Sequence, residues 1–183
     1  MNCPRRSRSV RIEVRRRAAL VLGDLGDKSG VEVMIKDLTT PELRQRQNVA
    51  VALLILNDWR AIPTWRQALK DRSPYIRGRA LAALGNLKAG VAFVDIVAHI
   101  QDRGCEQNCM ALPVGCTACD VLVTLGNRRA VPYLIRALND KGVSSFVAQA
   151  AAHALGALTN QPFGYDYAKW KAWWAESGRA KYN

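Results

Sequence analysis

The feature that most constrains this chain is an internal repeat with a period of 31 to 38 residues. A leucine that closes an apolar stretch recurs at intervals of 31, 31, 38 and 33 residues. These leucines are Leu25, Leu56, Leu87, Leu125 and Leu158. Another apolar residue follows each of the first four by 13 residues, so these periods hold two apolar stretches in constant register. Such a period is typical of stacked helical hairpins, in which each unit buries its apolar face against its neighbours.

Both apolar stretches of a period have the residue spacing of helices. In the first stretch, alanine recurs at one equivalent position of successive repeats, which we call a column. At this position two helices must approach closely, and leucine or valine follows on the same face. The alanines of this column are Ala18, Ala80, Ala118 and Ala151. In the second stretch apolar residues are spaced by three and four, as in Ile62, Trp65 and Leu69. Strands are not expected, because apolar and polar residues never alternate for long and alanine-rich segments have low β-propensity.

Turn residues support the same helix boundaries. Thr40-Pro41 and Ser73-Pro74 place a capping hydroxyl and a first-turn proline before two of the first helices. We therefore predict an all-α fold, a right-handed α-solenoid of about five helical hairpins.

Two segments of the chain carry a resemblance to a known family. Residues 76–87 (IRGRALAALGNL) and 127–140 (NRRAVPYLIRALND) resemble the short bacterial HEAT-like repeats first recognised in phycobilisome lyases. The resemblance covers nearly the whole chain and implies an armadillo-like helical scaffold that binds protein in a bacterial cell. The closing segment is similar to the tail that ends many bacterial HEAT-like proteins, and we interpret Trp170, Trp173 and Trp174 as a cap over the core.

We expect one repeat domain over residues 1–183. Five hairpins exceed the three or so that a repeat array needs for stability, and 49% apolar residues suffice to fill the shared core. The repeats should span about 10–40, 41–72, 73–104, 112–142 and 144–176, with a cysteine-containing insertion at about 103–113.

The sequence shows no targeting segment. It has no apolar run of 18 residues, so no membrane span is expected. Met1 is followed by arginines without an apolar stretch, so no signal peptide is visible. We expect a cytoplasmic protein.

The chain is basic, and much of its charge lies at one end. Lys and Arg number 27 against 15 Asp and Glu, which gives a net charge of +12. The anion-binding candidates are the arginines of the first residues, Arg5, Arg6, Arg8 and Arg11. Such a block suits phosphates, acidic protein surfaces or anionic lipid. The alternative is a solubilising outer face on a terminal repeat.

Charged residues also recur in repeat register. One column holds Arg15, Arg46 and Arg77, and another holds Asp71, Asp102 and Asp140. In HEAT-like families such residues often bridge neighbouring repeats. Because Gly115 and Ala148 interrupt the arginine column and Thr40 the aspartate column, we expect these contacts mainly in the middle of the array.

A cysteine cluster interrupts the repeat. Cys105-x3-Cys109-x6-Cys116-x2-Cys119 falls where the period lengthens to 38, and four nearby thiols could hold zinc or form a disulfide. The register argues against zinc, because Cys119 falls in a small buried column and Cys116 in a polar one. Cys3 makes the number of cysteines odd, which weakens a full disulfide framework. We therefore favour free thiols and predict neither a metal site nor a cofactor.

Candidate catalytic groups are few. His99 and His153 lie in different repeats without a partner at a recognisable motif spacing, and no glycine-rich phosphate loop occurs. From this we predict that the protein is not an enzyme and has no catalytic residues.

Two functions remain, both of them binding. The first is a scaffold that binds an unidentified protein or peptide along its concave face. An acidic partner would match the positive charge of the chain. The residues that the register places on that face are Lys36, Thr64, Gln67, Asp95, Tyr133 and Arg136. The alternative is a nucleic-acid-binding solenoid like the HEAT-like alkylpurine DNA glycosylases, which use tryptophans beside an exposed carboxylate. Trp59 and Asp58 invite that comparison, whereas the register places Trp65 in the core.

Overall fold

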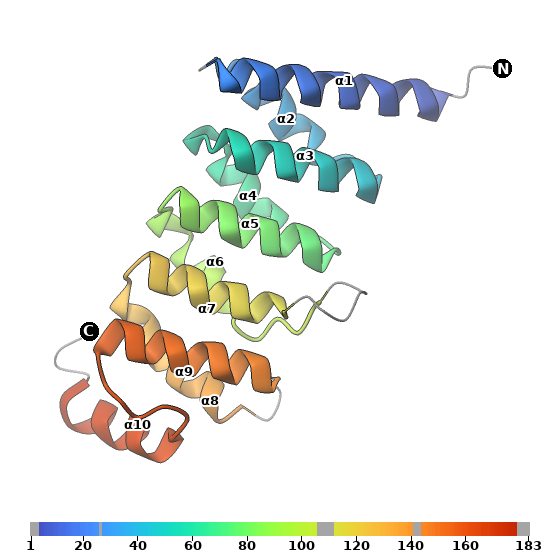
Figure 1. Cartoon of the computed structure of the whole chain (residues 1–183). Coiled ribbons are helices and arrows are strands. Elements are labelled where there is room, and N and C mark those ends of the chain that lie inside the picture. The colour runs from blue at the N-terminus through green and yellow to red at the C-terminus, as the bar shows by residue number, and fades with distance from the viewer. Residues whose placement is uncertain (1–3, 26, 106–111, 141–143, 179–183) are drawn as a thin grey trace. The chain divides into compact units, whose positions relative to one another are not determined.

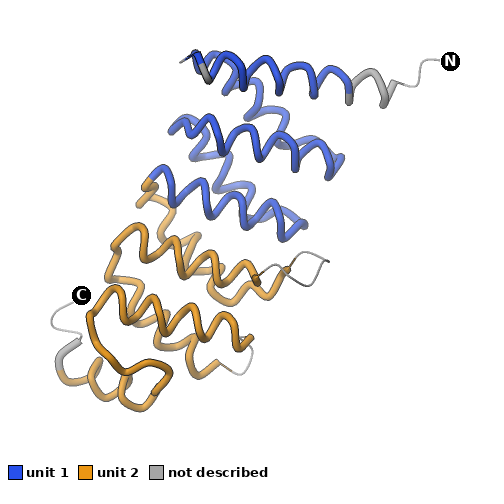
Figure 2. Tube along the Cα trace, viewed as in Figure 1, with its two compact units in different colours: residues 1–87 blue, residues 88–183 orange. Residues whose placement is uncertain are grey.

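The computed structural model describes residues 4–25, 27–105, 112–140 and 144–178 (Figure 1). Within these ranges every regular element is a helix and there is no strand, which confirms the all-α prediction. The chain divides into two compact units, residues 1–87 and residues 88–183 (Figure 2). The prediction of one domain with five repeat boundaries stays a prediction. None of the described helices is both long enough and apolar enough to cross a membrane.

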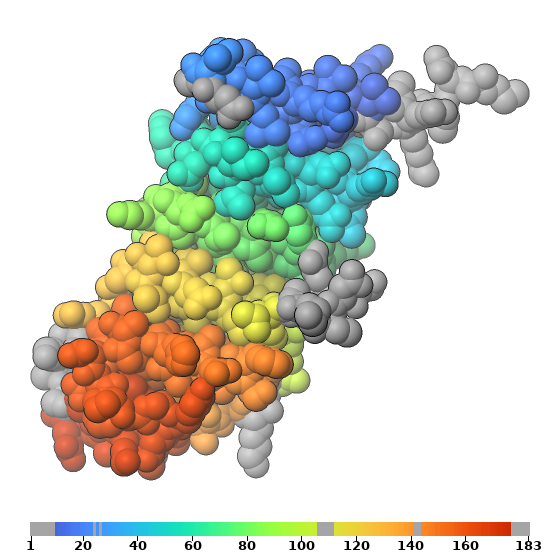
Figure 3. All heavy atoms as spheres, viewed as in Figure 1, coloured from blue at the N-terminus to red at the C-terminus, as the bar shows by residue number. Residues whose placement is uncertain are grey.

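Unit 1 is built from long and short helices in alternation. The long helices are α1 (Pro4–Asp24), α3 (Leu43–Leu56) and α5 (Pro74–Asn86). The short helices are α2 (Val31–Asp37) and α4 (Ile62–Ala68), the latter preceded by the 3₁₀ turn η1 (Trp59–Ala61). Figure 1 shows the long helices stacked in one layer with the short helices behind them. In the space-filling view of Figure 3, the side chains of α1, α3 and α5 form a continuous layer.

Unit 2 repeats the same arrangement and adds a closing helix. Its long helices are α7 (Val114–Thr124) and α9 (Ser145–Thr159). Its short helices, each preceded by a 3₁₀ turn, are α6 (Phe93–Ala98) after η2 (Gly90–Ala92) and α8 (Val131–Leu138) after η3 (Arg128–Ala130). The chain then forms α10 (Tyr167–Trp173), which contacts α8, and a π-helical turn, η4 (Trp174–Gly178).

The cores of both units follow the columns that the period predicts. Ala80, Ala118 and Ala151 are fully buried, and so is Trp65, in agreement with its predicted core position. Ala18, the first member of the alanine column, is a correction because it is exposed. No described element precedes α1, so no earlier described helix covers this position.

The tail closes the core of unit 2 through one tryptophan. Trp170 is fully buried, and its Nε1 donates a hydrogen bond to the carbonyl oxygen of Gly164 at 2.9 Å. Its ring lies edge-on to Phe163 at 5.0 Å and to Trp173 at 5.7 Å between centroids. Trp173 and Trp174 are half-buried at the rim of this cluster.

A glycine explains one gap in the arginine column. A Cβ atom on Gly115 would lie 2.3 Å from the backbone oxygen of Ile100, so the first turn of α7 leaves no room for a side chain there. The Gly115 amide instead donates to the carbonyl oxygen of Asp102 at 2.9 Å. The chain that follows α6 is thereby held against the start of α7.

Candidate functional site

The six residues predicted to line a binding face all lie on short helices. Lys36 is on α2, Thr64 and Gln67 are on α4, Asp95 is on α6, and Tyr133 and Arg136 are on α8. The structure brings Thr64 and Gln67 together in a pocket of unit 1, and Tyr133 and Arg136 in a pocket of unit 2. Lys36 and Asp95 line neither pocket.

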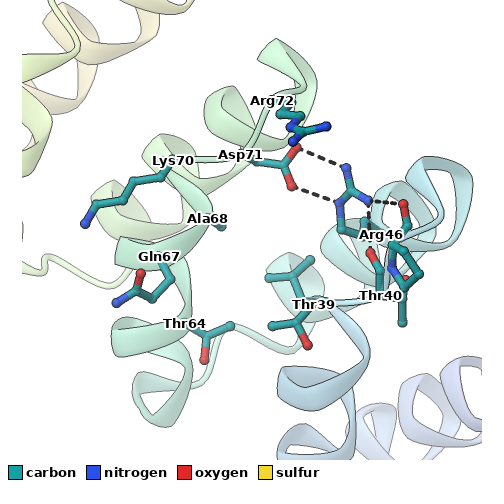
Figure 4. Close-up of a pocket in the computed structure, with 11 residues that line it drawn as sticks. Thr39, Thr40, Arg46, Thr64, Gln67, Ala68, Lys70, Asp71 and Arg72 are labelled. Carbon is teal, nitrogen blue, oxygen red and sulfur yellow. Dashed lines mark hydrogen bonds and ion pairs between the residues drawn. The ribbon is translucent and has the colours of Figure 1, made fainter.

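The pocket of unit 1 lies where the end of α2, the start of α3 and the end of α4 meet (Figure 4). Its volume is about 450 Å³. Thr64, Gln67 and Lys70 follow one edge, and the pair of Arg46 and Asp71 stands at the opposite edge (Figure 4). The other lining residues are Leu38, Thr39, Thr40, Pro41, Ala68 and Arg72. Most of these come from the two loops and have no periodic signal in the sequence.

A bidentate ion pair fixes one wall of this pocket. Arg46 donates from Nε to Asp71 Oδ2 at 2.8 Å and from Nη2 to Asp71 Oδ1 at 3.2 Å. Its Nη1 donates to the carbonyl oxygens of Thr40 and Pro41 at 2.9 and 2.8 Å. Arg46 therefore ties the loop before α3 to the loop before α5. The pair joins the arginine and aspartate columns within the predicted repeat 41–72, whereas the expectation was of bridges between neighbouring repeats.

The first repeat forms a similar bridge that the columns did not predict. Arg15 donates from Nη2 and Nε to the carboxylate of Asp37 at 2.7 and 3.0 Å. Asp37 is the last residue of α2 and lies three positions before Thr40, which occupies the aspartate column. Both residues lie in the predicted repeat 10–40, so the expectation that contacts between repeats lie mainly in the middle of the array stays a prediction.

Thr40 is the one residue of this pocket with an unsatisfied buried group among the described residues. Only 7% of the residue is exposed, and its Oγ1 has no hydrogen-bond partner in the described part of the chain. Its predicted capping role is also wrong, because the N-cap of α3 is Glu42 and no side chain caps it. Ser73 is the N-cap of α5, but its hydroxyl makes no capping bond either. A buried hydroxyl without a partner costs free energy.

The rim of this pocket is positively charged. Lys70 and Arg72 are exposed, whereas the carboxylate of Asp71 is neutralised by Arg46. Thr64 and Gln67 add neutral hydrogen-bonding groups. Two cations beside neutral donors suit a carboxylate or another anionic group.

The pocket of unit 2 has a different chemical character. It has a volume of about 320 Å³ and is lined mainly by apolar side chains of α6 and α8. Phe93 meets Tyr133 edge-to-face, with ring centroids 6.4 Å apart, and the guanidinium of Arg129 lies 5.7 Å from the Phe93 centroid. Val94 and Tyr133 are exposed, and Arg136 adds one charge. Such a surface suits an apolar or aromatic side chain.

The basic block at the start of the chain is only partly described. The side chains of Arg5, Arg6 and Arg8 lie outside the described residues. Arg11 is described and exposed on α1.

Further along α1, two arginines form ion pairs with Glu13. It accepts hydrogen bonds from Arg16 Nη2 at 2.5 Å and from Arg17 Nε at 3.0 Å. The hydrogen bond from Arg16 is the largest cause that lowers the pKa of Glu13 to about 2.

The cysteine cluster is described in part. Cys105 is an exposed free thiol, Cys116 and Cys119 are buried free thiols, and Cys109 lies outside the described residues. Cys116 was expected on a polar face, and its burial is a correction. At the start of the same helix, the amide of Val114 donates to the carbonyl oxygen of Gly104 at 2.9 Å.

Burial also governs the reactivity of these thiols. Desolvation raises the pKa of Cys116 to about 11 and that of Cys119 to about 12. In the described part of the chain, no group of three His, Cys, Asp or Glu side chains is placed to hold a metal ion.

The carboxylate beside Trp59 is not placed for base catalysis. Asp58 is buried and caps η1, and its Oδ1 accepts from Arg60 Nε at 2.9 Å. The side chain of Arg60 is the main cause that lowers the pKa of Asp58. Trp59 is exposed, so the arrangement offers an aromatic ring without an accessible carboxylate.

Comparison with known proteins supports the interpretation of the fold. Residues 5–85 match the model of the HEAT repeats family. No curated protein sequence matches the chain.

One solved structure gives a fold match over most of the chain. The complex of CpcE and CpcF of phycocyanin lyase from Nostoc sp. PCC7120 is similar, with a TM-score of 0.61 and 24% identity. The match covers 86% of this chain and 62% of that chain, so this protein spans less than two thirds of the length of the structure it matches. The resemblance to HEAT-like repeats of the phycobilisome-lyase type and the helical solenoid fold are thereby confirmed.

The prediction that the protein is not an enzyme is contradicted by the same comparison. The similar structure belongs to phycocyanin lyase, and a lyase is an enzyme. That prediction depended on the lack of familiar catalytic motifs. The inference fails because a helical-repeat surface can promote a reaction by holding substrates in position, which requires no catalytic triad or phosphate loop.

Proposed function

We propose that this protein is a HEAT-repeat scaffold that binds an acidic segment of a partner protein in the pocket of unit 1. The observation that carries the proposal is the pair of exposed cations, Lys70 and Arg72, on the rim of a pocket of about 450 Å³. A carboxylate of the partner would be attracted by both cations and could accept hydrogen bonds from them. The likeness to phycocyanin lyase supports a place in an enzyme complex, with the scaffold positioning a protein substrate.

The pocket of unit 2 extends this proposal to a second kind of side chain. Phe93, Val94 and Tyr133 form an apolar surface on which an aromatic or aliphatic residue of a partner would bury its area. A partner that engages both pockets would therefore present acidic and apolar residues.

A peptide selection tests the proposal and requires no identified partner. Random peptides displayed on phage and selected on the wild-type protein should be enriched in Asp and Glu. The same selection on the variant with Lys70→Glu and Arg72→Glu should lose that enrichment, because the rim becomes acidic. Arg44→Glu is the matched control, since Arg44 is exposed on α3 and does not line the pocket.

Affinity measurements on the selected peptides then separate the pocket from general charge. Lys70→Glu should weaken binding about tenfold or more, which corresponds to about 1.4 kcal/mol. Arg44→Glu should change the affinity far less. Equal weakening by both variants would mean that net charge alone attracts the peptides, and the pocket assignment would fail. Preferential capture of nucleic acid, abolished by nuclease, would favour the nucleic-acid alternative instead.

A further inference from the structure

The outer face of α1 has the composition of a buried face. Val14, Ala18 and Val21 each have an equivalent position, by the repeat register, in every later long helix. Their equivalents are buried in α3, α5, α7 and α9. These equivalents are Gln45, Ile76, Val114 and Val147; Val49, Ala80, Ala118 and Ala151; and Ala52, Ala83, Val121 and Ala154. In three of the four helices all of these positions are apolar.

In α1 the same columns are exposed. Val14 is 61% exposed and Val21 is 59% exposed, and Ala18 between them is exposed as well. Val10 and Leu25 continue this stripe at both ends and are also exposed. We call Val10, Val14, Ala18, Val21 and Leu25 the α1 stripe. No described element of unit 1 covers it.

An exposed apolar stripe of this kind is unusual, because a contiguous apolar patch on a protein surface promotes association. Unit 2 shows the contrasting solution, since its closing helix α10 buries Trp170 at the end of the repeat pattern. The residues that α1 places on its outer face are instead those that receive a neighbouring helix elsewhere in the chain.

The charges beside the stripe specify the kind of helix that would fit. From Val10 to Val21 the helix carries four arginines and one glutamate. Arg15 pairs with Asp37, and Arg16 and Arg17 share Glu13, so two positive charges remain in excess beside the stripe. Arg17 lies on the same side of the helix as Val14 and Val21, and its side chain is 75% exposed. A second copy of the chain would bring its own arginines against these, and like charges would oppose that pairing.

We propose that the α1 stripe binds an acidic amphipathic helix of a partner protein, which continues the helix stacking of unit 1. Apolar residues of that helix would pack on Val14, Ala18 and Val21, as one long helix packs on the next within the unit. Its flanking carboxylates would meet Arg11 and Arg17. This surface is separate from the pocket proposed above, so either proposal can fail without the other.

A designed peptide tests the proposal directly. The probe is a fluorescein-labelled peptide of about 20 residues, long enough to form a helix, with leucines at helical spacing and glutamates beside them. A second probe carries lysines in place of the glutamates. Fluorescence anisotropy should show saturable binding of the acidic probe and binding about tenfold weaker or less for the basic one.

Matched variants locate the binding on α1. Val14→Glu and Val21→Glu should each weaken binding of the acidic probe about tenfold or more, because a charge would enter the apolar contact. Ile55→Glu is the control, since Ile55 on α3 is 60% exposed and lies outside the stripe. It should leave the affinity unchanged, and so should Lys70→Glu. Far-ultraviolet circular dichroism of each variant should match the wild type, because all the replaced side chains are exposed or at the surface.

Three results would overturn the proposal. The first is the absence of saturable binding, and the second is equal binding of the acidic and basic probes. The third is sedimentation of the wild type as a dimer that Val14→Glu converts to a monomer, because a second copy would then be the occupant.

Discussion

Replacement of Thr40 by valine tests the buried wall of the pocket in unit 1. Valine keeps the shape of threonine and removes the hydroxyl, whose Oγ1 is buried and lacks a hydrogen-bond partner among the described residues. An unsatisfied buried polar group costs about 1 to 3 kcal/mol. The variant should therefore be more stable than the wild type by about 1 kcal/mol, whereas most substitutions of buried residues destabilise.

The chain provides a matched control for this substitution. Thr159 in unit 2 is buried to nearly the same extent, with 6% exposed against 7% for Thr40. Its hydroxyl is satisfied, because it donates to the carbonyl oxygen of Leu155 at 2.7 Å. Thr159→Val should therefore lose about 1 kcal/mol. The two variants make the same chemical change in opposite hydrogen-bonding surroundings, so their stabilities should shift in opposite directions.

Equilibrium unfolding in urea, followed by far-ultraviolet circular dichroism, measures both variants. The comparison holds where the dependence of the unfolding free energy on urea is the same as in the wild type. A loss of more than about 1 kcal/mol for Thr40→Val would refute the reasoning, because the hydroxyl would then have a partner in solution. The same variant should bind the acidic peptides as tightly as the wild type, because the hydroxyl is buried out of reach of a ligand and the cations of the rim are unchanged.

Three further predictions follow from the packing. Arg46→Ala, Asp71→Ala and the double variant should give a coupling free energy of about 2 kcal/mol in denaturant unfolding. The reason is that the ion pair is bidentate and each side chain is only 14% exposed. Additive effects of the two substitutions would mean that the pair contributes no coupling. Trp170→Ala should cost about 3 to 5 kcal/mol, as for a buried aromatic residue, and an unchanged melting temperature would mean that the tail is not part of the core. Alkylation at pH 8 should modify Cys105 quickly and Cys119 only after unfolding, because burial raises the pKa of Cys119 to about 12 and leaves almost no thiolate. Mass spectrometry of the labelled peptides distinguishes the two sites. Rapid modification of Cys119 in the folded protein would refute its burial.

The period predicted the core because one physical requirement recurs in every repeat. Each long helix must present small or aliphatic residues to its neighbours, so Ala80, Ala118 and Ala151 could be aligned and found buried. The same register placed Trp65 in the core correctly. It also placed Thr64 and Gln67 on a short helix, where they line a pocket.

The remaining features depend on contacts that a period does not encode. Thr40, Lys70 and Arg72 lie in loops, whose course is set by bonds such as those of Arg46 to two backbone carbonyls. Cys116 was misplaced because the insertion breaks the repeat register immediately before it, and the first turn of α7 bonds to Asp102 and Gly104 instead. After an insertion, the repeat register no longer predicts which side of the helix is buried.

The α1 stripe shows why a repeat pattern must be combined with exposure before it indicates function. By sequence, Val14 and Val21 are ordinary members of core columns, and nothing in their identity separates them from Ile76 or Ala83. Exposure separates them, because the later members are buried and these two are exposed. An apolar column position is therefore a core residue inside the array and a docking residue at its first described helix. If so, substitutions at Val14 and Val21 should affect partner binding, whereas the equivalent substitutions at Ile76 and Ala83 should affect folding.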